Sequence, residues 1–228
     1  MKILGISSYF HDSSAALIID GELSFAAHEE RYTRIKHDSS FPLNTVRKSL
    51  EFSGLNINEI DNFVYFEKPI LKFERILDDY FKTAPKAIKS FQESMPMWLK
   101  EKLFTKSNIL KQLKSIGLSK NNYHKLKFSE HHLSHMASAF FPSPYINSAI
   151  LTIDGVGENS STCIGKGDNN KIEKLEQINY PDSLGLLYSA FTQYLGFKVN
   201  SGEYKLMGLA PYGEPKYVNL ILDNLVQV

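Results

Sequence analysis

A chain of 228 residues with 43% hydrophobic and 22% charged residues is long enough to bury a core, as one large domain or two small ones. Its net charge of +1 gives no electrostatic reason to expect a nucleic-acid partner. Its single cysteine, Cys163, excludes an internal disulfide framework, and no run approaches the ~18–20 apolar residues of a membrane helix. We therefore expect a cytoplasmic protein with neither a membrane nor a nucleic acid as partner.

The N-terminal residues predict a strand pair. Residues 2–7 have the pattern of a buried strand, a polar loop follows, and residues 14–19 predict a second strand. Asp20-Gly21 is a hairpin signal of the type I′ kind, so residues 22–29 are expected to return as a third strand.

The next segments mix helix and strand. Pro42 is placed to open a helix that runs to Ser53 and is stopped by the following glycine. Residues 60–66 predict a further strand. Residues 67–120 carry long amphipathic stretches, so we expect a helical insertion there, after which residues 123–128 return to strand.

A histidine cluster lies in the next predicted helix, over residues 129–140. His131 and His135 are four residues apart, which puts both imidazoles on one helix face. Asp154 ends an apolar β-branched run and precedes glycine, where the chain turns and exposes the carboxylate at a sheet edge. Two imidazoles and a carboxylate are a typical ligand set for a divalent transition metal, with one position open for substrate or water. The alternative is two ordinary helix histidines, since this spacing is common.

The opening strand pair recurs later in the chain. A shift of 147 residues places residues 3–7 on 150–154 and residues 13–17 on 160–164 without a gap. Identities are few, but the order of strand, polar loop, strand and tight turn matches, with the second turn near residues 167–169. We interpret the match as a duplication; the alternative is that two unrelated hairpins look alike.

Two polar segments near the N-terminus are candidates for chemistry. In residues 7–14, His11 and Asp12 lie among small hydroxyl residues that suit phosphate oxygens, and His11 suits proton transfer near neutral pH. Residues 29–38 hold arginines and Lys36, whose charges suit phosphate or carboxylate oxygens. The alternatives are a solvated turn and a solvated charged face.

The C-terminal part predicts a helix and a glycine-rich connection. Asp182 or Ser183 is placed to cap a helix that Gly196 ends. Residues 200–213 follow as a run punctuated by glycines, whose spacing fits neither a P-loop nor a dinucleotide motif. A nucleotide-contacting loop and a plain helix connection are both open interpretations.

This order of strand, turn, strand, hairpin, strand and helix, used twice, resembles the actin-like ATPase superfamily. The resemblance implies an α/β fold in which two related, ribonuclease-H-like halves face each other across a cleft. Residues 1–148 would then form the first half, with the helical insertion at residues 67–120. Residues 149–228 would begin a second half that is incomplete.

A more specific resemblance rests on six blocks of residues. In chain order they are Gly5 with His11-Asp12-Ser13, Glu29-Glu30-Arg31, Lys36-His37-Asp38 with Phe41-Pro42, His131-His132-Leu133-Ser134-His135, Ile153-Asp154-Gly155-Val156-Gly157-Glu158, and Gly202-Glu203-Tyr204-Lys205-Leu206-Met207-Gly208-Leu209-Ala210. Together they resemble the O-carbamoyltransferases that modify antibiotics and nodulation factors. The same lobe is similar to the metal-binding domain of the threonylcarbamoyl-adenosine tRNA-modifying ATPase.

This resemblance implies a transferase that uses ATP and a divalent metal, with iron expected first and zinc or manganese as alternatives. Carbamoyl phosphate would be broken down, and the carbamate would react with ATP to give a carbamoyl-adenylate. The carbamoyl group would then pass to a hydroxyl of a small-molecule acceptor.

The same resemblance assigns roles by position. His131, His135 and Asp154 would bind the metal that grips nucleotide phosphates, and His11 and Asp12 would sit at the reacting centre. Substrate and nucleotide contacts would fall on five further residues: Lys36 for carbamoyl phosphate, and Gly155, Gly157, Gly202 and Lys205 for the nucleotide.

Members of that family are much longer than 228 residues. We therefore expect a fragment, a truncated gene product or half of a split enzyme, poorly competent alone. Exposed apolar surface would favour a homo-oligomer or pairing with a separate C-terminal half. Two other functions stay open: a non-catalytic nucleotide- and metal-binding remnant, and a tRNA threonylcarbamoyl transferase-like protein, against which the lack of a basic charge balance argues.

Overall fold

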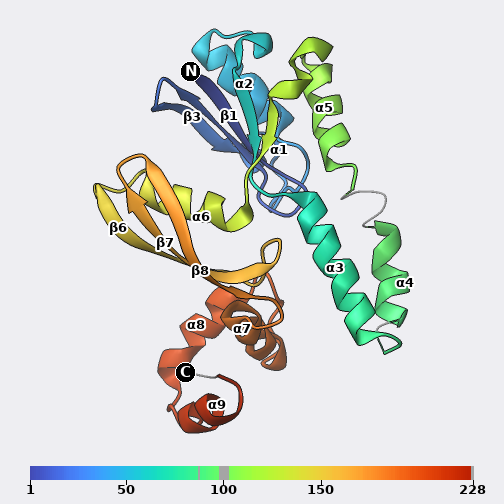
Figure 1. The fold of residues 1–228 in the computed structure, drawn as a ribbon, viewed down its shortest axis with the longest axis vertical. Coiled ribbons are helices and arrows are strands. Elements are labelled where there is room, and N and C mark those ends of the chain that lie inside the picture. Colours follow the sequence, from blue (N-terminus) through green and yellow to red (C-terminus); the bar gives the residue numbers. More distant parts are fainter. Residues whose placement is uncertain (87, 98–102, 227–228) are drawn as a thin grey trace.

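The framework of the protein is a pair of β-sheets joined by helices. The computed structural model describes residues 1–86, 88–97 and 103–226 (Figure 1). A five-stranded mixed sheet comes first in the chain and a three-stranded antiparallel sheet follows. The predicted α/β class is confirmed.

The first sheet has the strand order β3-β2-β1-β4-β5. Its strands are β1 (Lys2–Ser7), β2 (Ser14–Ile19), β3 (Glu22–His28), β4 (Asn62–Tyr65) and β5 (Leu126–Phe128). Strands β1, β2 and β3 are antiparallel, whereas β4 runs parallel to β1 and β5 parallel to β4. Asp20 and Gly21 have φ angles of 51° and 92°, so the predicted type I′ turn is confirmed.

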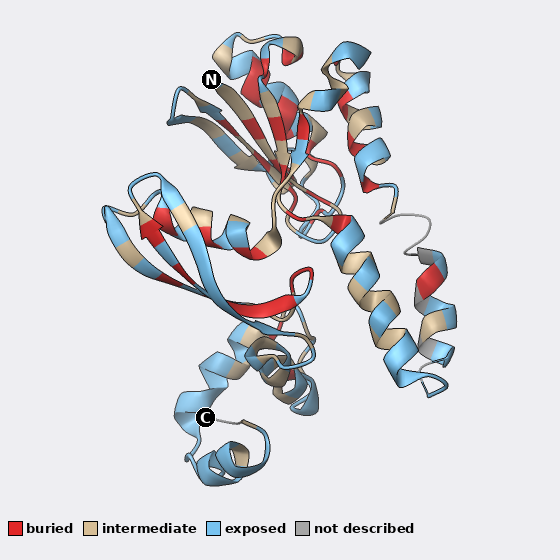
Figure 2. Ribbon diagram, viewed as in Figure 1, coloured by how far each residue is buried: buried red, intermediate tan, exposed pale blue. Residues whose placement is uncertain are grey.

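One face of this sheet is covered by α2 (Leu43–Ser53) and α5 (Thr105–Ser115). Helix α2 begins after Pro42 and ends at Gly54, whose φ is 68°, as predicted. The buried side chains of strands and helices gather between them, as the red segments of Figure 2 show. The largest fully buried members of this core are Leu4, Leu17, Val46, Ile60, Phe63, Tyr65, Ile109 and Leu113.

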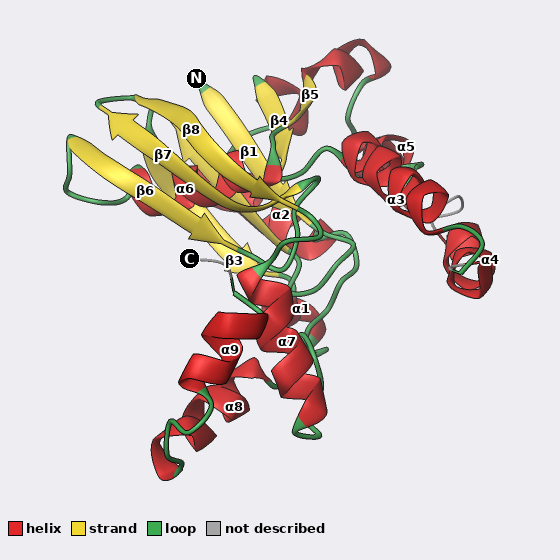
Figure 3. Cartoon of the chain, turned by 60° about the horizontal axis from the view of Figure 1, so that its bottom comes forward, coloured by secondary structure: helices red, strands yellow, loops and turns green. Residues whose placement is uncertain are grey.

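The predicted insertion at residues 67–120 is helical in its described part. It comprises α3 (Pro69–Thr83), α4 (Ile88–Met97) and α5, and residues 87 and 98–102 lie outside the described residues. Short helical turns α1 (Glu30–Thr33) and η1 (Ile57–Glu59) complete this part of the chain. Helices α3 and α4 project to one side of the sheets in Figure 3.

The predicted strand over residues 123–128 is wrong in its first half. A 3-10 helix, η3 (Lys120–Lys125), precedes β5. The Asn58 side-chain oxygen accepts hydrogen bonds from Asn122 Nδ2 at 2.8 Å, and Lys125 Nζ donates to the carbonyls of Asn58 and Ile60 at 3.0 and 2.8 Å. These contacts with residues about 60 positions earlier hold the segment in a compact turn, which a local strand pattern cannot reveal.

The second sheet repeats the opening hairpin of the first. Its strands are β6 (Asn147–Ile153), β7 (Ser160–Asp168) and β8 (Lys171–Asn179), in that order. In the first sheet Ile3 lies opposite Ile18, and in the second Ile150 lies opposite Gly165. Both partners are displaced by the same 147 residues, so the two hairpins share one register.

Helix α6 (His131–Phe140) packs on the second sheet. Its buried residues form a small second core with the strands: Met136, Phe140, Ile150 and Cys163. On its other side, a largely apolar cleft of about 970 Å³ separates α6 from the first sheet. The helix that carries the histidine cluster thus lies between the two sheets.

Gly167 is required by this packing, because a Cβ there would lie 2.4–2.6 Å from the Phe140 ring. We expect Gly167→Ala to lower the free energy of unfolding by about 1–3 kcal/mol, the usual cost of overpacking a core. Gly208→Ala is the matched control, because its Cβ would meet no described residue within 4 Å and alanine favours the helix. Urea unfolding measures both, and a Gly167→Ala variant as stable as wild type would contradict the packing argument.

The C-terminal residues form helices α7 (Leu184–Tyr194), α8 (Glu203–Leu209) and α9 (Val218–Asn224), with the turn η4 (Ala210–Tyr212). The Ser183 side chain accepts from Leu186 N at 3.0 Å, and Gly196 follows the helix end with φ 84°, so both predicted boundaries of α7 are confirmed. Most residues of these helices are exposed in Figure 2. No helix in the described part of the chain has the length and apolar character to cross a membrane.

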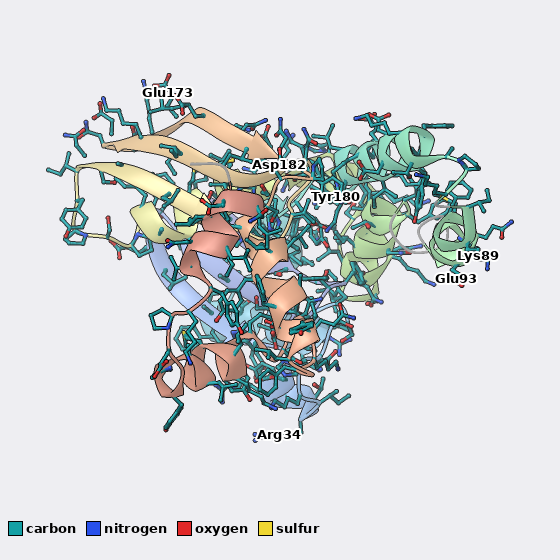
Figure 4. All side chains as sticks on the ribbon, turned by 90° about the horizontal axis from the view of Figure 1, so that it is seen from below. Arg34, Lys89, Glu93, Glu173, Tyr180 and Asp182 are labelled. Carbon is teal, nitrogen blue, oxygen red and sulfur yellow. The ribbon has the colours of Figure 1, made fainter. Side chains whose placement is uncertain are left out.

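A cation–π contact joins the insertion to the loop between β8 and α7. Tyr180 and Asp182 lie there, as labelled in Figure 4, and the Arg75 guanidinium carbon lies 4.8 Å from the Tyr180 ring centroid. Lys89 and Glu93, on α4, lie far from this contact in the same view. The middle of α3 therefore contacts the segment that follows β8.

Candidate metal centre

The N-terminus of α6 is held by a carboxylate that comes from the second sheet. Glu158, in the loop between β6 and β7, accepts hydrogen bonds from His131 N at 2.9 and 3.0 Å. The same carboxylate accepts from Lys68 N at 2.8 Å and is buried. A carboxylate suits a helix N-terminus because it meets unpaired N–H groups and the positive end of the helix dipole. Glu158 therefore fixes the position at which His131 begins the helix.

The structure brings the three predicted ligands together. His131 Nε2 lies 2.6 Å from Asp154 Oδ2 and 3.0 Å from His135 Nε2. His135 Nε2 lies 3.4 Å from the same carboxylate oxygen. Among the residues described, this is the one group of three or more His, Cys, Asp or Glu side chains whose ligand atoms lie within 4.8 Å of one another.

Asp154 is ionised in this arrangement. Hydrogen bonds from His131 first, and then from His135, hold the pKa of its carboxyl well below the usual range, against the opposing effect of burial. Gly155 N–H also donates to Asp154 Oδ1 at 2.6 Å. The carboxylate therefore carries the negative charge that a cation requires.

His132 has a structural role. Its Nδ1 lies 2.8 Å from Thr152 Oγ1 and its Nε2 2.9 Å from the Ser160 carbonyl, so both ring nitrogens have partners. Burial lowers the pKa of its imidazole, which keeps it neutral. His132 thus anchors α6 on the second sheet while its neighbour His131 faces the ligand group.

The donor set fits a divalent transition metal. Two imidazole nitrogens and one carboxylate oxygen are ligands that such ions take, and zinc–nitrogen bonds of ~2.0–2.1 Å bring two ligand nitrogens to about 3.0–3.4 Å from each other. The two Nε2 atoms are 3.0 Å apart. In the described part of the chain the buried Nδ1 of His131 has no hydrogen-bond partner, which leaves that nitrogen able to carry the ring proton while Nε2 binds a cation.

A second cluster surrounds Asp12. His11 Nδ1 lies 2.8 Å from Asp12 Oδ2, and His37 Nδ1 lies 2.9 Å from Asp12 Oδ1. The hydrogen bond from His37 is the main cause that lowers the pKa of the Asp12 carboxyl. His37 lies in one of the recognised blocks, but the sequence assigns it no role, because its contact with Asp12 spans 25 residues. Lys36, beside it, is exposed.

A series of contacts connects the two clusters. The His11 ring lies 4.4 Å from the Phe10 ring, and Lys72 Nζ lies 5.6 Å from the Phe10 centroid. Lys72 pairs with Glu67 at 3.0 Å, and Glu67 Oε2 lies 3.9 Å from His131 Nδ1. This series of contacts runs from the first loop to His131, one of the three predicted ligands.

The predicted nucleotide contacts fall in two places. Gly155 and Gly157 are in the loop after Asp154, and Gly202 and Lys205 are at the start of α8. Packing explains two of these glycines: a Cβ on Gly157 would lie 3.0 Å from His132 and 3.2 Å from His131, and one on Gly202 would lie 2.7 Å from a backbone oxygen. A role in nucleotide binding stays a prediction for all four.

Comparison with known proteins decides the family. Residues 2–228 match the family model described as carbamoyltransferase N-terminus. The chain belongs to this family. The predicted resemblance to carbamoyltransferases is thereby confirmed at the family level.

Relatives extend beyond the region that this chain covers. An uncharacterized protein, sll1178, of Synechocystis sp. is 53% identical over 99% of this chain and 37% of its own length. The nodulation protein NolNO of Sinorhizobium fredii is 34% identical over 92% of this chain and 29% of its own length. The chain thus spans about a third of these curated relatives. A solved structure of the Aquifex aeolicus PPX-GPPA enzyme matches 94% of this chain and 65% of its own, at 14% identity with a TM-score of 0.33.

Proposed function

We propose that the chain is the N-terminal, metal-binding part of a carbamoyltransferase that uses carbamoyl phosphate and ATP to carbamoylate a hydroxyl of a small molecule. The observation that carries this proposal is the convergence of His131, His135 and Asp154 in a chain of the carbamoyltransferase N-terminus family. Iron is the metal we expect first, and the same donors accept zinc or manganese.

The proposed reaction has three steps. Carbamoyl phosphate and water give carbamate and phosphate. Carbamate attacks the α-phosphorus of ATP, which gives carbamoyl-adenylate and releases pyrophosphate. The acceptor oxygen then attacks the carbamoyl carbon, the acceptor loses its proton, and AMP leaves. A bound divalent metal supplies a Lewis acid that neutralises charge on phosphate oxygens.

The residues of the first loop have the geometry for the proton transfer. His11 Nδ1 is directed to Asp12, so its other ring nitrogen is available to take the proton of the acceptor hydroxyl. Asp12 orients the imidazole and stabilises the positive charge that it gains. His37, on the other carboxylate oxygen, fixes Asp12 in turn.

Two observations support the finer parts of the proposal. The shared register of the two hairpins supports an actin-like fold with a first half in residues 1–148 and a second half that begins at residue 149. The Ser183 side chain donates to the Gly155 carbonyl at 2.7 Å, so α7 begins beside the loop to which we assign nucleotide contacts.

The second sheet supports a further partner. Several of its large apolar side chains are 44–61% exposed: Leu151, Ile153, Ile164, Leu175 and Ile178. Apolar surface of this extent favours burial against protein. We propose that a separate C-terminal half, or a second copy of the chain, covers it.

ATP binding tests the function. We expect the wild-type chain to bind ATP only when loaded with metal, so that chelation weakens ATP affinity more than about 10-fold, or ~1.4 kcal/mol. The double variant His131→Ala/His135→Ala should behave like the chelated protein. Calorimetric titration measures both.

Turnover separates the alternatives. With carbamoyl phosphate, ATP and a hydroxylated acceptor, the complete enzyme that contains this chain should release AMP and pyrophosphate in equal amounts. Metal-dependent ATP binding without any AMP release would instead favour the non-catalytic module. ATP binding that is indifferent to metal would contradict the proposed role of the three ligands.

A further inference from the structure

The second ring nitrogen of His131 lacks the hydrogen-bond acceptor that a metal-bound histidine needs. His131 Nδ1 is buried and has no hydrogen-bond partner among the residues that the structure describes. The Phe66 and His135 rings lie beside the imidazole, with centroids 5.7 and 4.6 Å away. Glu67 Oε2 is the charged oxygen that faces this nitrogen, at 3.9 Å.

Metal binding at Nε2 requires a hydrogen-bond acceptor beside Nδ1. When Nε2 of a neutral imidazole binds a cation, the ring proton must be on Nδ1, which becomes a donor. A buried N–H without an acceptor costs about 1–3 kcal/mol. Histidine ligands therefore usually donate the other ring N–H to a carboxylate or carbonyl oxygen. At 3.9 Å, Glu67 Oε2 needs to move only about 1 Å to reach normal hydrogen-bond length.

Glu67 is fixed close to α6 by its neighbours. The carbonyl of Phe66 accepts a hydrogen bond from Ser134 Oγ at 2.9 Å, so the backbone before Glu67 is tied to the histidine helix. The Glu67 side chain is 7% exposed and pairs with Lys72 Nζ at 3.0 Å. Lys72 balances the charge of the buried carboxylate and holds the oxygen that faces His131.

We propose that Glu67 is a positioning residue of the metal centre. Its carboxylate accepts the Nδ1–H of His131, which directs Nε2 to the metal, and Lys72 shares this carboxylate with the imidazole. The inference rests on the proposed metal centre and adds an outer residue that the sequence motifs do not contain. It also connects the metal to the first loop, because Lys72 lies against Phe10.

The competing explanation is that Glu67 is buried only to pair with Lys72. The two explanations predict different effects of losing Lys72 on metal affinity. If the pair is merely structural, removing either member weakens folding and affects metal affinity alike. If Glu67 serves His131, loss of Glu67 weakens metal binding, whereas loss of Lys72 releases the carboxylate toward the imidazole.

The experiment measures Zn²⁺ affinity by competition with a chromophoric chelator. We expect Glu67→Gln to weaken Zn²⁺ binding about 10–100-fold, the usual effect of an outer-shell change. Lys72→Met should bind Zn²⁺ at least as tightly as wild type. Glu130→Gln is the matched control, because Glu130 precedes His131 but pairs with Lys68 and Lys174, at 3.1 and 3.3 Å. It should change the affinity less than about 2-fold.

A spectroscopic readout is independent of affinity. In the Zn²⁺-loaded chain, long-range ¹H–¹⁵N spectra should show the His131 proton on Nδ1, with the downfield shift of a hydrogen bond to a carboxylate. Glu67→Gln should move this signal upfield, whereas Glu130→Gln should leave it in place. An unchanged signal together with wild-type Zn²⁺ affinity in Glu67→Gln would overturn the inference.

The outcomes separate the inference from the function on which it rests. A wild-type chain that binds no Zn²⁺ would overturn the metal centre and the role of Glu67 together. If the wild-type chain binds Zn²⁺ and Glu67→Gln binds it equally tightly, the metal centre stands and only the proposed role of Glu67 is overturned. Parallel weakening in Glu67→Gln and Lys72→Met would identify a structural ion pair.

Discussion

Replacing His131 with alanine should abolish stoichiometric metal binding. His131 Nε2 is the atom closest to both other ligands, at 2.6 Å from Asp154 Oδ2 and 3.0 Å from His135 Nε2. Its loss leaves two ligands, one of them a half-exposed histidine. Because outer-shell changes alone cost ~10–100-fold in affinity, we expect the loss of this ligand to cost more than about 100-fold. Metal analysis of the purified protein and Zn²⁺ titration measure it.

The same variant should still fold, with a modest loss of stability. The alanine removes the hydrogen bond between His131 and the ionised Asp154 carboxylate, and a hydrogen bond to a charged group is worth about 1.5–3 kcal/mol. His132 and Glu158 still hold α6. The His132 ring keeps its bond to the Ser160 carbonyl, and the Glu158 carboxylate accepts from the backbone N–H of residue 131, which alanine also has. His124→Ala, at an exposed histidine on η3, is the control and should bind metal like wild type. Stoichiometric metal retained in His131→Ala would rule out the site.

Boundaries set by local signals could be predicted from the sequence. Strands β1 and β2, the turn at Asp20-Gly21 and the ends of α2 and α7 all follow the predicted residues. Each depends on residues within a few positions of the boundary: a glycine whose backbone adopts positive φ, or a serine whose side chain accepts from the first helical turn. Such interactions join residues that are close in the sequence, so sequence pattern and propensity are enough to predict these boundaries.

The convergence of His131, His135 and Asp154 could be predicted for a related reason. The pair His131 and His135 is local, and the helix period alone places both on one face. Asp154 is 23 residues from His131, but its position at the end of a predicted strand gave a separate signal. Family resemblance joined the two observations, and the geometry brings all three side chains together.

The carboxylates that support the site gave no local signal. Glu67 is 64 positions from His131 in the chain, and Glu158 bonds to backbone groups 27 and 90 residues away. Glu67 lies outside the recognised blocks, and Glu158 lies in one of them but has no role that the sequence assigns. Their burial depends on where two sheets and a helix meet, which is a property of the tertiary fold. Glu29 belongs to the same class, because its segment predicts an anion-binding or solvated charge run, whereas the fold buries its carboxylate at the start of α2.

The second large effect is expected at Glu29, which is 1% exposed. Its carboxylate accepts from Asn44 N at 3.0 Å and Thr45 N at 2.8 Å, and from both side chains at 2.7 Å. These backbone groups are the unpaired donors at the start of α2, where Pro42 provides no side-chain cap. Each buried donor left without an acceptor costs about 1–3 kcal/mol, so Glu29→Ala should lower the free energy of unfolding by roughly 3–5 kcal/mol. Urea unfolding measures this loss.

Two comparisons test whether the cap is the cause. Glu29→Gln keeps the shape of the side chain but turns its amide NH₂, itself a donor, toward the donors of either Asn44 or Thr45. It should therefore lower the free energy of unfolding by a large part of the loss expected for Glu29→Ala. Glu51→Ala, on the same helix, removes a surface carboxylate that pairs with Lys48, and should cost less than about 0.5 kcal/mol. A loss below about 1 kcal/mol in Glu29→Ala would contradict the cap. Since α2 covers β2 and β3 while the loop at Asp12 adjoins them, the cap also holds the scaffold of the proposed reacting loop.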